Sequence, residues 1–333
     1  MNRRDVVIAA LALGAPTLGW TQMPGRVYRV GYFGYTATNT PDDDRVWGAF
    51  VQRLRELGFT EGANLVIEQR FVEGRNERYA DFAAEMVKLK ADVVVATSGA
   101  AAREVMKAST TLPIVTTAVP DPVRPGLVTS LARPGGQLTG ISNLADELVP
   151  KRLELLKAAL PGARRIAFVR CPRCAQSAGA SVTQVSAVHA EEEAAARSLG
   201  VTWLPVDIND ATEFDSVTAQ LRREQPDALL IGATQINFAL REQWIALSVK
   251  QHLPMLTPAR GFGPAMLSHG PDVAATYRKA AEYVAKILGG ARPGDLPMEQ
   301  PTRFELVINL KTARALGLTI PLSVLLRADE VIE

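Results

Sequence analysis

The sequence predicts an α/β protein built from two doubly wound parallel-sheet lobes. The chain has 333 residues, of which 47% are hydrophobic, and this is too long for one ordinary hydrophobic core. Short apolar runs alternate with segments of helical periodicity, a pattern that favours parallel strands joined by helical crossovers. The alternation stops near Ser142 and restarts at Arg164, so we expect two similar lobes.

The first lobe begins with a clean apolar run and continues through three more. The predicted strands are residues 27–33, 64–71, 92–97 and 112–118. The predicted helices are residues 42–57, 77–89, 99–108 and 123–131. Each run is bounded by turn residues, which is typical of strands in a parallel sheet.

The second lobe repeats the pattern. Its predicted strands are residues 164–169, 201–207, 227–233 and 253–258, and its predicted helices are near 178–199, 212–224 and 236–251. There is also a weak internal echo, because residues 71–99 and 205–235 both run from an extended segment through an amphipathic helix into an Asp-led strand.

The N-terminus has the layout of an export signal. Arg3 and Arg4 precede an apolar run from Val6 to about Leu18, and small and polar residues follow. We expect residues 1–21 to be removed, although a buried first helix or strand remains an alternative. This run contains no cysteine that could carry a lipid anchor, and it is short for a membrane span. Sec and twin-arginine export both stay open.

Charge and motifs exclude several classes of function. Lysine and arginine total 37 against 35 acidic residues, and no basic run indicates a nucleic-acid partner. The three histidines are His189, His252 and His269, and we expect His189 to lie on a solvated face beside Glu191, Glu192 and Glu193. No nucleophile elbow, P-loop or dinucleotide fingerprint is present, and one C-x-x-C cannot complete a four-ligand zinc site. We therefore expect no enzyme activity, no cofactor and no metal.

The residues that follow each strand are the candidates for a binding site, because ligands of doubly wound folds bind at the carboxyl ends of strands. Ser98 is the strongest candidate, since a serine that caps a helix leaves free N–H groups that can hold an anion. Asp121 can bind an ammonium group or only cap the following turn. The candidate ligand-binding residues are Tyr35, Thr36, Thr97, Ser98, Gly99, Asp121, Cys171, Thr234, Gln235, Arg260 and Phe262.

Two stretches carry a resemblance to a known family. They are "DPVRPGLVTSLARPGGQLTG", residues 121–140, and the C-terminal "ELVINLKTARALGL". With the segments around residues 27–36 and 49–108, they make the chain similar to the substrate-binding proteins of the ABC-transporter family that includes the tryptophan and tyrosine importers' receptors. The resemblance covers nearly the whole chain.

The resemblance implies a type I periplasmic binding protein fold, with two lobes joined by three crossovers. It implies an N-terminal lobe of residues 26–142 plus about 270–298, and a C-terminal lobe of residues 143–269 plus about 299–333. First-lobe positions of the family pattern match Thr36, Thr97, Ser98, Gly99 and Asp121. Cys171 and Thr234 depart from it, because many relatives have asparagine and an acidic residue there.

The function implied is that of a periplasmic receptor, a monomer that binds a small molecule between closing lobes and docks on an ABC permease. The ligand can be an aromatic amino acid or a small carboxylate. Two other functions stay open: a ligand-sensing receptor for a membrane sensor kinase, and a thiol-disulfide oxidoreductase using Cys171 and Cys174. In an oxidising compartment we expect the two thiols to form a local disulfide that stiffens a ligand-facing loop; free buried thiols are the alternative.

Overall fold

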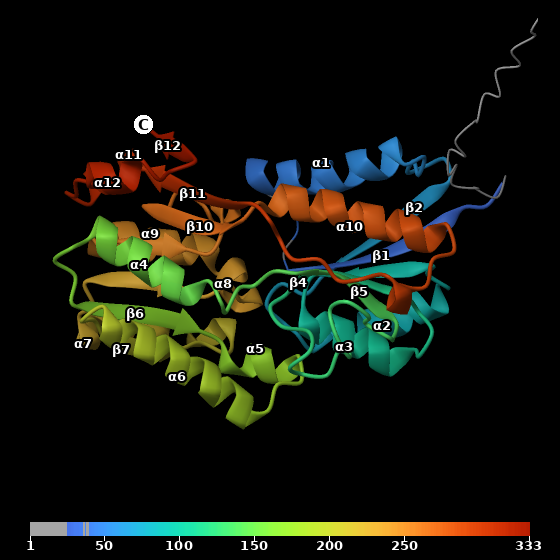
Figure 1. Ribbon diagram of the computed structural model, residues 1–333, viewed down its shortest axis with the longest axis horizontal. Helices are drawn as coiled ribbons and strands as arrows, with labels where there is room; N and C mark the ends of the chain where they lie inside the picture. The colour runs from blue at the N-terminus through green and yellow to red at the C-terminus, as the bar shows by residue number, and fades with distance from the viewer. Residues whose placement is uncertain (1–24, 36, 38–39) are drawn as a thin grey trace, which may run out of the picture.

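The protein folds into two α/β lobes that lie side by side along its long axis (Figure 1). The structure is a computed structural model and describes residues 25–35, 37 and 40–333. The proposed signal peptide, residues 1–21, and Thr36 lie outside these ranges. Among the described residues, one sheet has the strand order β2-β1-β3-β4-β5 and the other β12-β11-β10-β9-β8-β6-β7. The predicted α/β class and the two parallel-dominated sheets are confirmed.

The N-terminal lobe is built on the first sheet, in which all neighbouring strands are parallel. Its strands are β1 (Tyr28–Gly34), β2 (Leu65–Phe71), β3 (Val93–Ala96), β4 (Ile114–Val119) and β5 (Leu138–Ser142). Helices α1 (Pro41–Glu56) and α10 (Val273–Leu288) cover one face, and α2 (Arg78–Lys88) and α3 (Gly99–Ala108) cover the other. Because both faces are covered, β3 is apolar at every position.

The C-terminal lobe is built on the second sheet. Its strands are β6 (Arg165–Arg170), β7 (Thr202–Asp207), β8 (Ala228–Ile231), β9 (Met255–Thr257), β10 (Leu267–Pro271), β11 (Phe304–Asn309) and β12 (Glu330–Ile332). On one face lie α4 (Val149–Ala159), α11 (Leu310–Ala315) and α12 (Leu322–Leu325); on the other lie α7 (Phe214–Glu224), α8 (Gln235–Ala239) and α9 (Arg241–Gln251). Helix α6 (Val182–Ser198) contacts β7 and α4.

The first five strands of each lobe have the same order, because β7-β6-β8-β9-β10 repeats β2-β1-β3-β4-β5. This common order accounts for the internal echo in the sequence. In both lobes the order reverses beside the first strand, and in folds of this kind ligands bind at that switch point. The two switch points lie at β1/β3 and β6/β8.

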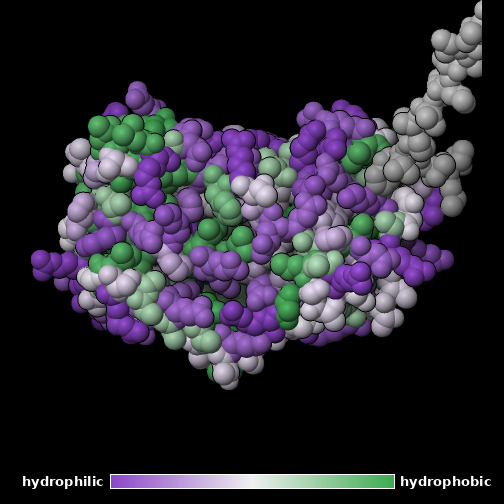
Figure 2. Space-filling view, viewed as in Figure 1, coloured by the Kyte–Doolittle hydropathy of each residue, from purple (hydrophilic) through white to green (hydrophobic). Residues whose placement is uncertain are grey.

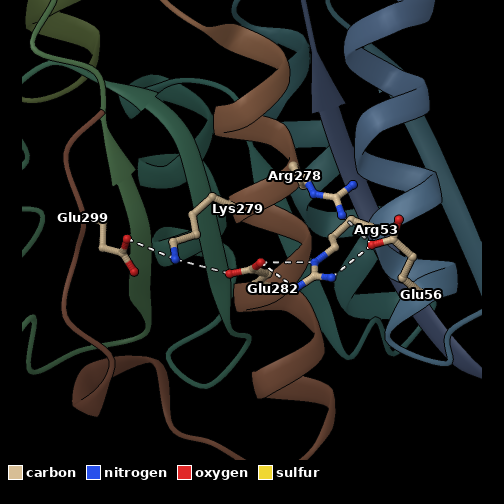
Figure 3. A network of polar contacts seen from close by, with 6 residues as sticks. All are labelled: Arg53, Glu56, Arg278, Lys279, Glu282 and Glu299. Carbon is tan, nitrogen blue, oxygen red and sulfur yellow. Dashed lines mark hydrogen bonds and ion pairs between the residues drawn. The ribbon is translucent and has the colours of Figure 1, made fainter. Parts of the chain in front are cut away.

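The chain passes between the lobes after β5, after β10 and after α10. The third passage runs beside the end of β5: Ser142 N–H donates to Glu299 O at 2.9 Å, and Glu299 N–H donates to Gly140 O at 2.9 Å. A network of ion pairs holds this passage to α10 and α1 (Figure 3). Lys279 lies 3.2 Å from both Glu282 and Glu299, and Glu282 accepts from Arg53 at 2.8 Å.

Some predicted helices differ from the structure. Residues 123–131 form turns instead of a helix. Pro125 lacks the N–H that a helix needs, and Gly126 has φ +72°, outside the helical region. The helix predicted near 178–199 is α6, which begins only at Val182, after Gly179 with φ +102° and a capping box at Ser181. A separate short helix, α5 (Pro172–Ser177), precedes it.

Candidate ligand-binding cleft

The carboxyl ends of four strands meet across the space between the lobes. Tyr35 follows β1 and Thr97 follows β3 in the N-terminal lobe. Cys171 follows β6 and Ala233 lies just beyond β8 in the C-terminal lobe. The parallel sheets direct these four ends to the same region because each pair flanks a switch point. These strand ends, which the sequence analysis proposed as candidates for a binding site, therefore lie around one cleft.

Two cavities occupy this cleft. Cavity 1, of about 160 Å³, and cavity 2, of about 170 Å³, share the lining residues Tyr35, Ala118, Ala145 and Ala233. Residues of both lobes line each cavity. Figure 2 shows a hollow between the lobes with hydrophobic residues at its edge. Because they share these lining residues, the two cavities are neighbours.

Cavity 1 is lined by aromatic rings from both lobes. They are Tyr32, Tyr35, Trp47, Phe71 and Tyr277 from the N-terminal lobe and Phe238 from the C-terminal lobe. The ring centroids of Tyr32 and Trp47 lie 4.9 Å apart, and Tyr35 stacks on Phe238 with centroids 6.0 Å apart. The hydroxyl groups of Tyr32 and Tyr277 lie 2.9 Å apart, and burial raises the pKa of both phenols above the ordinary value. Cavity 1 is therefore suited to a flat apolar group, with neutral hydroxyls at one side.

Cavity 1 also contains a buried cation. Arg152 of α4 is 1% exposed and donates to the carbonyl oxygens of His269 at 2.8 Å, Ala145 at 3.2 Å and Pro258 at 3.3 Å. Burial lowers the pKa of Arg152 to about 10, and the nearby Asp146 opposes this shift. Arg152 stays charged at neutral pH. Its hydrogen bonds connect Ala145, in the first passage between the lobes, to β10 and to Pro258 at the end of β9.

Cavity 2 contains the N-terminus of α3. Ser98 caps this helix by accepting from Ala101 N–H at 3.1 Å. The N–H groups of Gly99 and Ala100 have no hydrogen-bond acceptor among the described residues, and both residues are buried and line the cavity. Unsatisfied N–H groups at a helix N-terminus attract an anion through their partial positive charge. This end of α3 can hold a carboxylate.

Helix α6 brings further polar groups to cavity 2. His189 and Glu192 line it, together with Gln184, Val185 and Val188. The expectation that the glutamates beside His189 are all solvated is wrong, because Glu192 is 5% exposed. Burial and the neighbouring Arg170 lower the pKa of His189, so this imidazole is neutral at pH 7.

Cys171 and Cys174 form a disulfide with Cα atoms 5.3 Å apart. Both residues line cavity 2, and the bridge lies at the start of α5, where Cys171 Sγ accepts from Cys174 N–H at 3.1 Å. The bridge therefore lies in the connection between β6 and α6, on the side of the C-terminal lobe that faces the cleft.

The structure brings most of the predicted site residues together. Cavity 2 is lined by Tyr35, Ser98, Gly99, Asp121, Cys171, Thr234 and Gln235, and cavity 1 by Tyr35 and Thr97. Asp121 is used as a cap, because its Oδ1 accepts from Val123 N–H at 2.9 Å and Arg124 N–H at 3.0 Å. Thr36 lies outside the described residues.

Two predicted residues do not line either cavity. Arg260 forms an ion pair with Glu330 of β12, and Phe262 is 1% exposed in the core of the C-terminal lobe. Phe262 contacts Phe238, which lines cavity 1; the two ring centroids lie 5.4 Å apart in an edge-on arrangement. The short helix η2 (Arg260–Phe262) after β9 turns both side chains away from the cavities and leaves Gly261 to line cavity 1.

Several cleft residues were missed in the sequence. They are Tyr32, Trp47, Phe71, Arg152, Glu192, Phe238, Arg241 and Tyr277. All of them lie within helices or strands, whereas the predicted site residues follow the ends of strands. For Glu192 a signal existed: Val185, His189, Glu192 and Ala196 follow the helical period of a buried stripe.

The lobes contact each other around the cavities. Arg103 of α3 donates to Ala178 O at 2.9 Å, and Gln184 of α6 donates to Arg124 O at 2.8 Å. An ion pair also crosses the cleft, from Arg241 of α9 to Asp43 of α1. These contacts hold the two lobes together around the cavities.

In the part of the chain that the structure describes, no group of histidine, cysteine, aspartate and glutamate side chains is placed to hold a metal ion. No helix there is long and apolar enough to cross a membrane.

Comparison with known proteins gives consistent matches. The family model for "ABC transporter substrate binding protein" matches residues 39–332. A curated tyrosine-binding protein of Clostridioides difficile (strain R20291) is 26% identical over 280 residues, covering 84% of this chain and 78% of that protein. A solved structure of a conserved domain protein from Vibrio cholerae is 27% identical, with a TM-score of 0.81, and covers 92% of this chain and 100% of that one. A domain from Streptococcus pneumonia in complex with L-Trp is 24% identical, with a TM-score of 0.77 and the same coverage.

Proposed function

We propose that this chain, which belongs to the family of ABC transporter substrate-binding proteins, binds an aromatic amino acid or a small aromatic carboxylate between its two lobes and delivers it to a permease for uptake. Proteins of this family are extracytoplasmic, bind small molecules and work with ABC permeases; the family is one of solute-binding proteins and not of enzymes. The choice of an aromatic ligand rests on the residues of the cleft.

The proposal rests on one observation: an aromatic cavity lies beside a cavity that contains free backbone N–H groups. Cavity 1 has aromatic rings from both lobes, and cavity 2 has the free N–H groups of Gly99 and Ala100. Tyr35 lines both cavities, so one ligand can place its ring in cavity 1 and its carboxylate at the start of α3. The tyrosine-binding relative agrees with a ligand of this kind.

Closure of the lobes follows from the same arrangement. Because residues of both lobes line each cavity, a ligand gains its full set of contacts only when the lobes are together. A ligand that binds one conformation better shifts the population toward it. We infer that the ligand stabilises the closed form, and that the permease binds this form.

Export, oligomeric state and the choice between uptake and sensing complete the proposed function. We propose that residues 1–21 are an export signal that is removed and that the mature protein acts as a monomer. A receptor for a sensor kinase would use the same cleft without transport. A neighbouring permease and ATPase gene would favour uptake, whereas a neighbouring histidine kinase gene would favour sensing.

A thermal-shift screen of the mature protein tests the proposal. The panel contains amino acids, aromatic acids and small aliphatic carboxylates. Since a ligand that binds only the folded state stabilises it by mass action, aromatic amino acids or aromatic acids should raise the melting temperature in a saturable way. A shift produced only by aliphatic compounds would contradict the aromatic assignment.

A further inference from the structure

Cavity 2 is lined by two carboxyl groups that form no ion pair among the described residues. Two of its charged residues neutralise each other, because Arg124 lies 3.3 Å from Asp121. The other arginine, Arg170, is paired with Asp207 at 2.6 Å, a residue that does not line the cavity. Two further acidic residues line the cavity, and for neither does the described part of the chain provide an ion pair. They are Asp146 and Glu192. The lining of cavity 2 therefore has an excess of acidic groups.

Glu192 is the more unusual of the two. It is 5% exposed, and its Oε2 is buried with no hydrogen-bond partner among the described residues. A buried carboxyl group normally has a donor or a cation beside it, because burial without a partner is costly. Helix α6 places Glu192 on the stripe that faces the cavity, one turn beyond His189 and Val188. The missing partner would have to come from the cavity.

We propose that cavity 2 contains a subsite for a cationic group of the ligand, an ammonium or guanidinium group held by Glu192 and Asp146, and that Glu192 loses a proton when this group binds. The inference rests on the proposed function, since it assigns an amine to the ligand of the same cleft. With the N–H groups of Gly99 and Ala100 on another wall of cavity 2, the cavity has a place for each charge of an α-amino acid.

The surroundings of Glu192 favour its protonated form in the empty protein. Burial, together with the Asp146 and Glu191 carboxyl groups, raises the pKa of Glu192 to about 8, while Arg170 opposes the shift. Helix α5 contributes no charged residue to the described lining of cavity 2, and Asp207 on β7 is paired with Arg170. His189 is neutral because its own pKa is lowered. In the empty protein at pH 7, Glu192 is therefore mostly protonated.

A cation stabilises the ionised carboxylate, so its binding releases the Glu192 proton to solvent. Below pH 8 this release opposes binding, and the affinity for a cationic ligand falls by up to about tenfold for each pH unit. A ligand without a cationic group needs no release, and its affinity has no such dependence on Glu192. The pH profile thus separates a cation subsite from a carboxyl group that only packs.

The test uses titration calorimetry of the mature protein with matched probes between pH 6 and pH 9. L-Tyrosine and tyramine contain an amine, and 3-(4-hydroxyphenyl)propionate has the same ring without one; L-lysine and putrescine are amines without an aromatic ring. Buffers with different ionisation enthalpies report the number of protons released. Glu192→Gln removes the carboxylate, and Glu193→Gln, an exposed position on the same helix paired with Arg197, is the control with the same change of charge.

We expect amine probes to bind at least tenfold more tightly than their amine-free partner at pH 8, with release of close to one proton at pH 7. Glu192→Gln should lower amine affinity about 10- to 100-fold and abolish proton release, as expected for loss of a charged hydrogen bond, while Glu193→Gln should change neither. Equal affinity for the amine-free probe, or unchanged proton release in Glu192→Gln, would overturn the inference.

The outcomes separate this inference from the proposed function. Binding of aromatic carboxylates without preference for an amine overturns the subsite and leaves the aromatic ligand standing. Binding of lysine or putrescine but of no aromatic probe supports the subsite and overturns the aromatic ligand. If no probe binds to the wild type, both are overturned. The folding of Glu192→Gln is checked without ligand: loss of a buried carboxylate should raise its melting temperature above that of the wild type at pH 8.5.

Discussion

Asp43 of α1 and Arg241 of α9 form an ion pair across the cleft, with Arg241 Nη2 2.7 Å from Asp43 Oδ2. The two residues belong to different lobes, and the Arg241 side chain is 8% exposed. The pair can therefore exist only when the lobes are together, and it connects the rims of cavity 1.

Arg241→Ala should weaken ligand binding. Because the pair is largely buried, we expect it to stabilise the closed form by more than an exposed pair does, about 1–2 kcal/mol, or roughly 5- to 30-fold in affinity. Calorimetry measures the change, with Arg197→Ala, which breaks an exposed pair with Glu193, as control. Equal affinities of the two variants would show that Arg241 does not assist closure.

Gly99→Ala should block closure without unfolding a lobe. A Cβ at Gly99 would lie 2.6 Å from the Cβ of Ala178, a contact too short to persist, and these atoms belong to different lobes. Alanine keeps the N–H group and is favourable in a helix. We expect at least tenfold weaker ligand binding and no ligand-induced decrease of the radius of gyration in small-angle X-ray scattering.

The control for this variant is Gly48→Ala in α1, where a Cβ would meet nothing within 4 Å. It should raise the free energy of unfolding by about 1 kcal/mol and leave binding unchanged. If Gly99→Ala binds and compacts like the wild type, the lobes do not need the contact between α3 and Ala178.

The two sheets were predictable because central strands such as β3 and β8 are apolar on both faces and end in turns. Val93 to Ala96 is such a run, and it is fully buried. The C-terminal strands were harder to predict, because β11 pairs antiparallel with β10 although the helix between them, α10, packs on the other lobe. The third passage between the lobes depends on Glu299, whose backbone bonds to β5 are not visible in any local pattern.

The site was predictable where it follows strand ends, and less so where helices supply it. Ser98 and Gly99 lie at the end of β3 and start α3, a position that topology alone assigns to the cleft. Trp47 and Tyr277 reach cavity 1 from the interiors of α1 and α10, so their role depends on how these helices pack. Glu192 was missed because a run of three glutamates suggests a solvated face, although the helical period places one of them inside.

His269 should make the protein sensitive to acid. It is 9% exposed and its Nδ1 has no partner among the described residues; burial and Arg152 lower its pKa to about 4. Because the unfolded state has the ordinary value near 6.5, it binds the extra proton between pH 6.5 and pH 4. His269 therefore destabilises the fold progressively over this interval, by up to about 3 kcal/mol.

Urea unfolding at pH 7.5 and pH 5 measures this effect. His269→Phe should lose most of the difference between the two pH values, whereas the exposed His252→Asn should retain it. An equal pH dependence in His269→Phe and the wild type would assign the acid sensitivity to other groups.

Removal of the Cys171–Cys174 disulfide should be tolerated. The bridge closes a very short loop, for which chain entropy gives at most about 2 kcal/mol of stability. The double variant Cys171→Ser/Cys174→Ser should fold, melt a few degrees lower, and bind ligand more weakly because the loop at cavity 2 is less constrained. Unchanged affinity would remove the loop-stiffening role, and reduction of insulin by the wild type would favour the oxidoreductase alternative.

The proposed function requires that an aromatic ligand is enclosed between the lobes with its ring in cavity 1. Titration calorimetry of L-tyrosine and L-tryptophan at pH 8, into the wild type and into Trp47→Ala, measures whether this ring is bound there. We predict one-to-one binding to the wild type and at least about tenfold weaker binding to Trp47→Ala, because an aromatic contact and its buried surface are lost together. Unchanged binding by Trp47→Ala would exclude a ring in cavity 1, and no heat from either amino acid would exclude both as ligands.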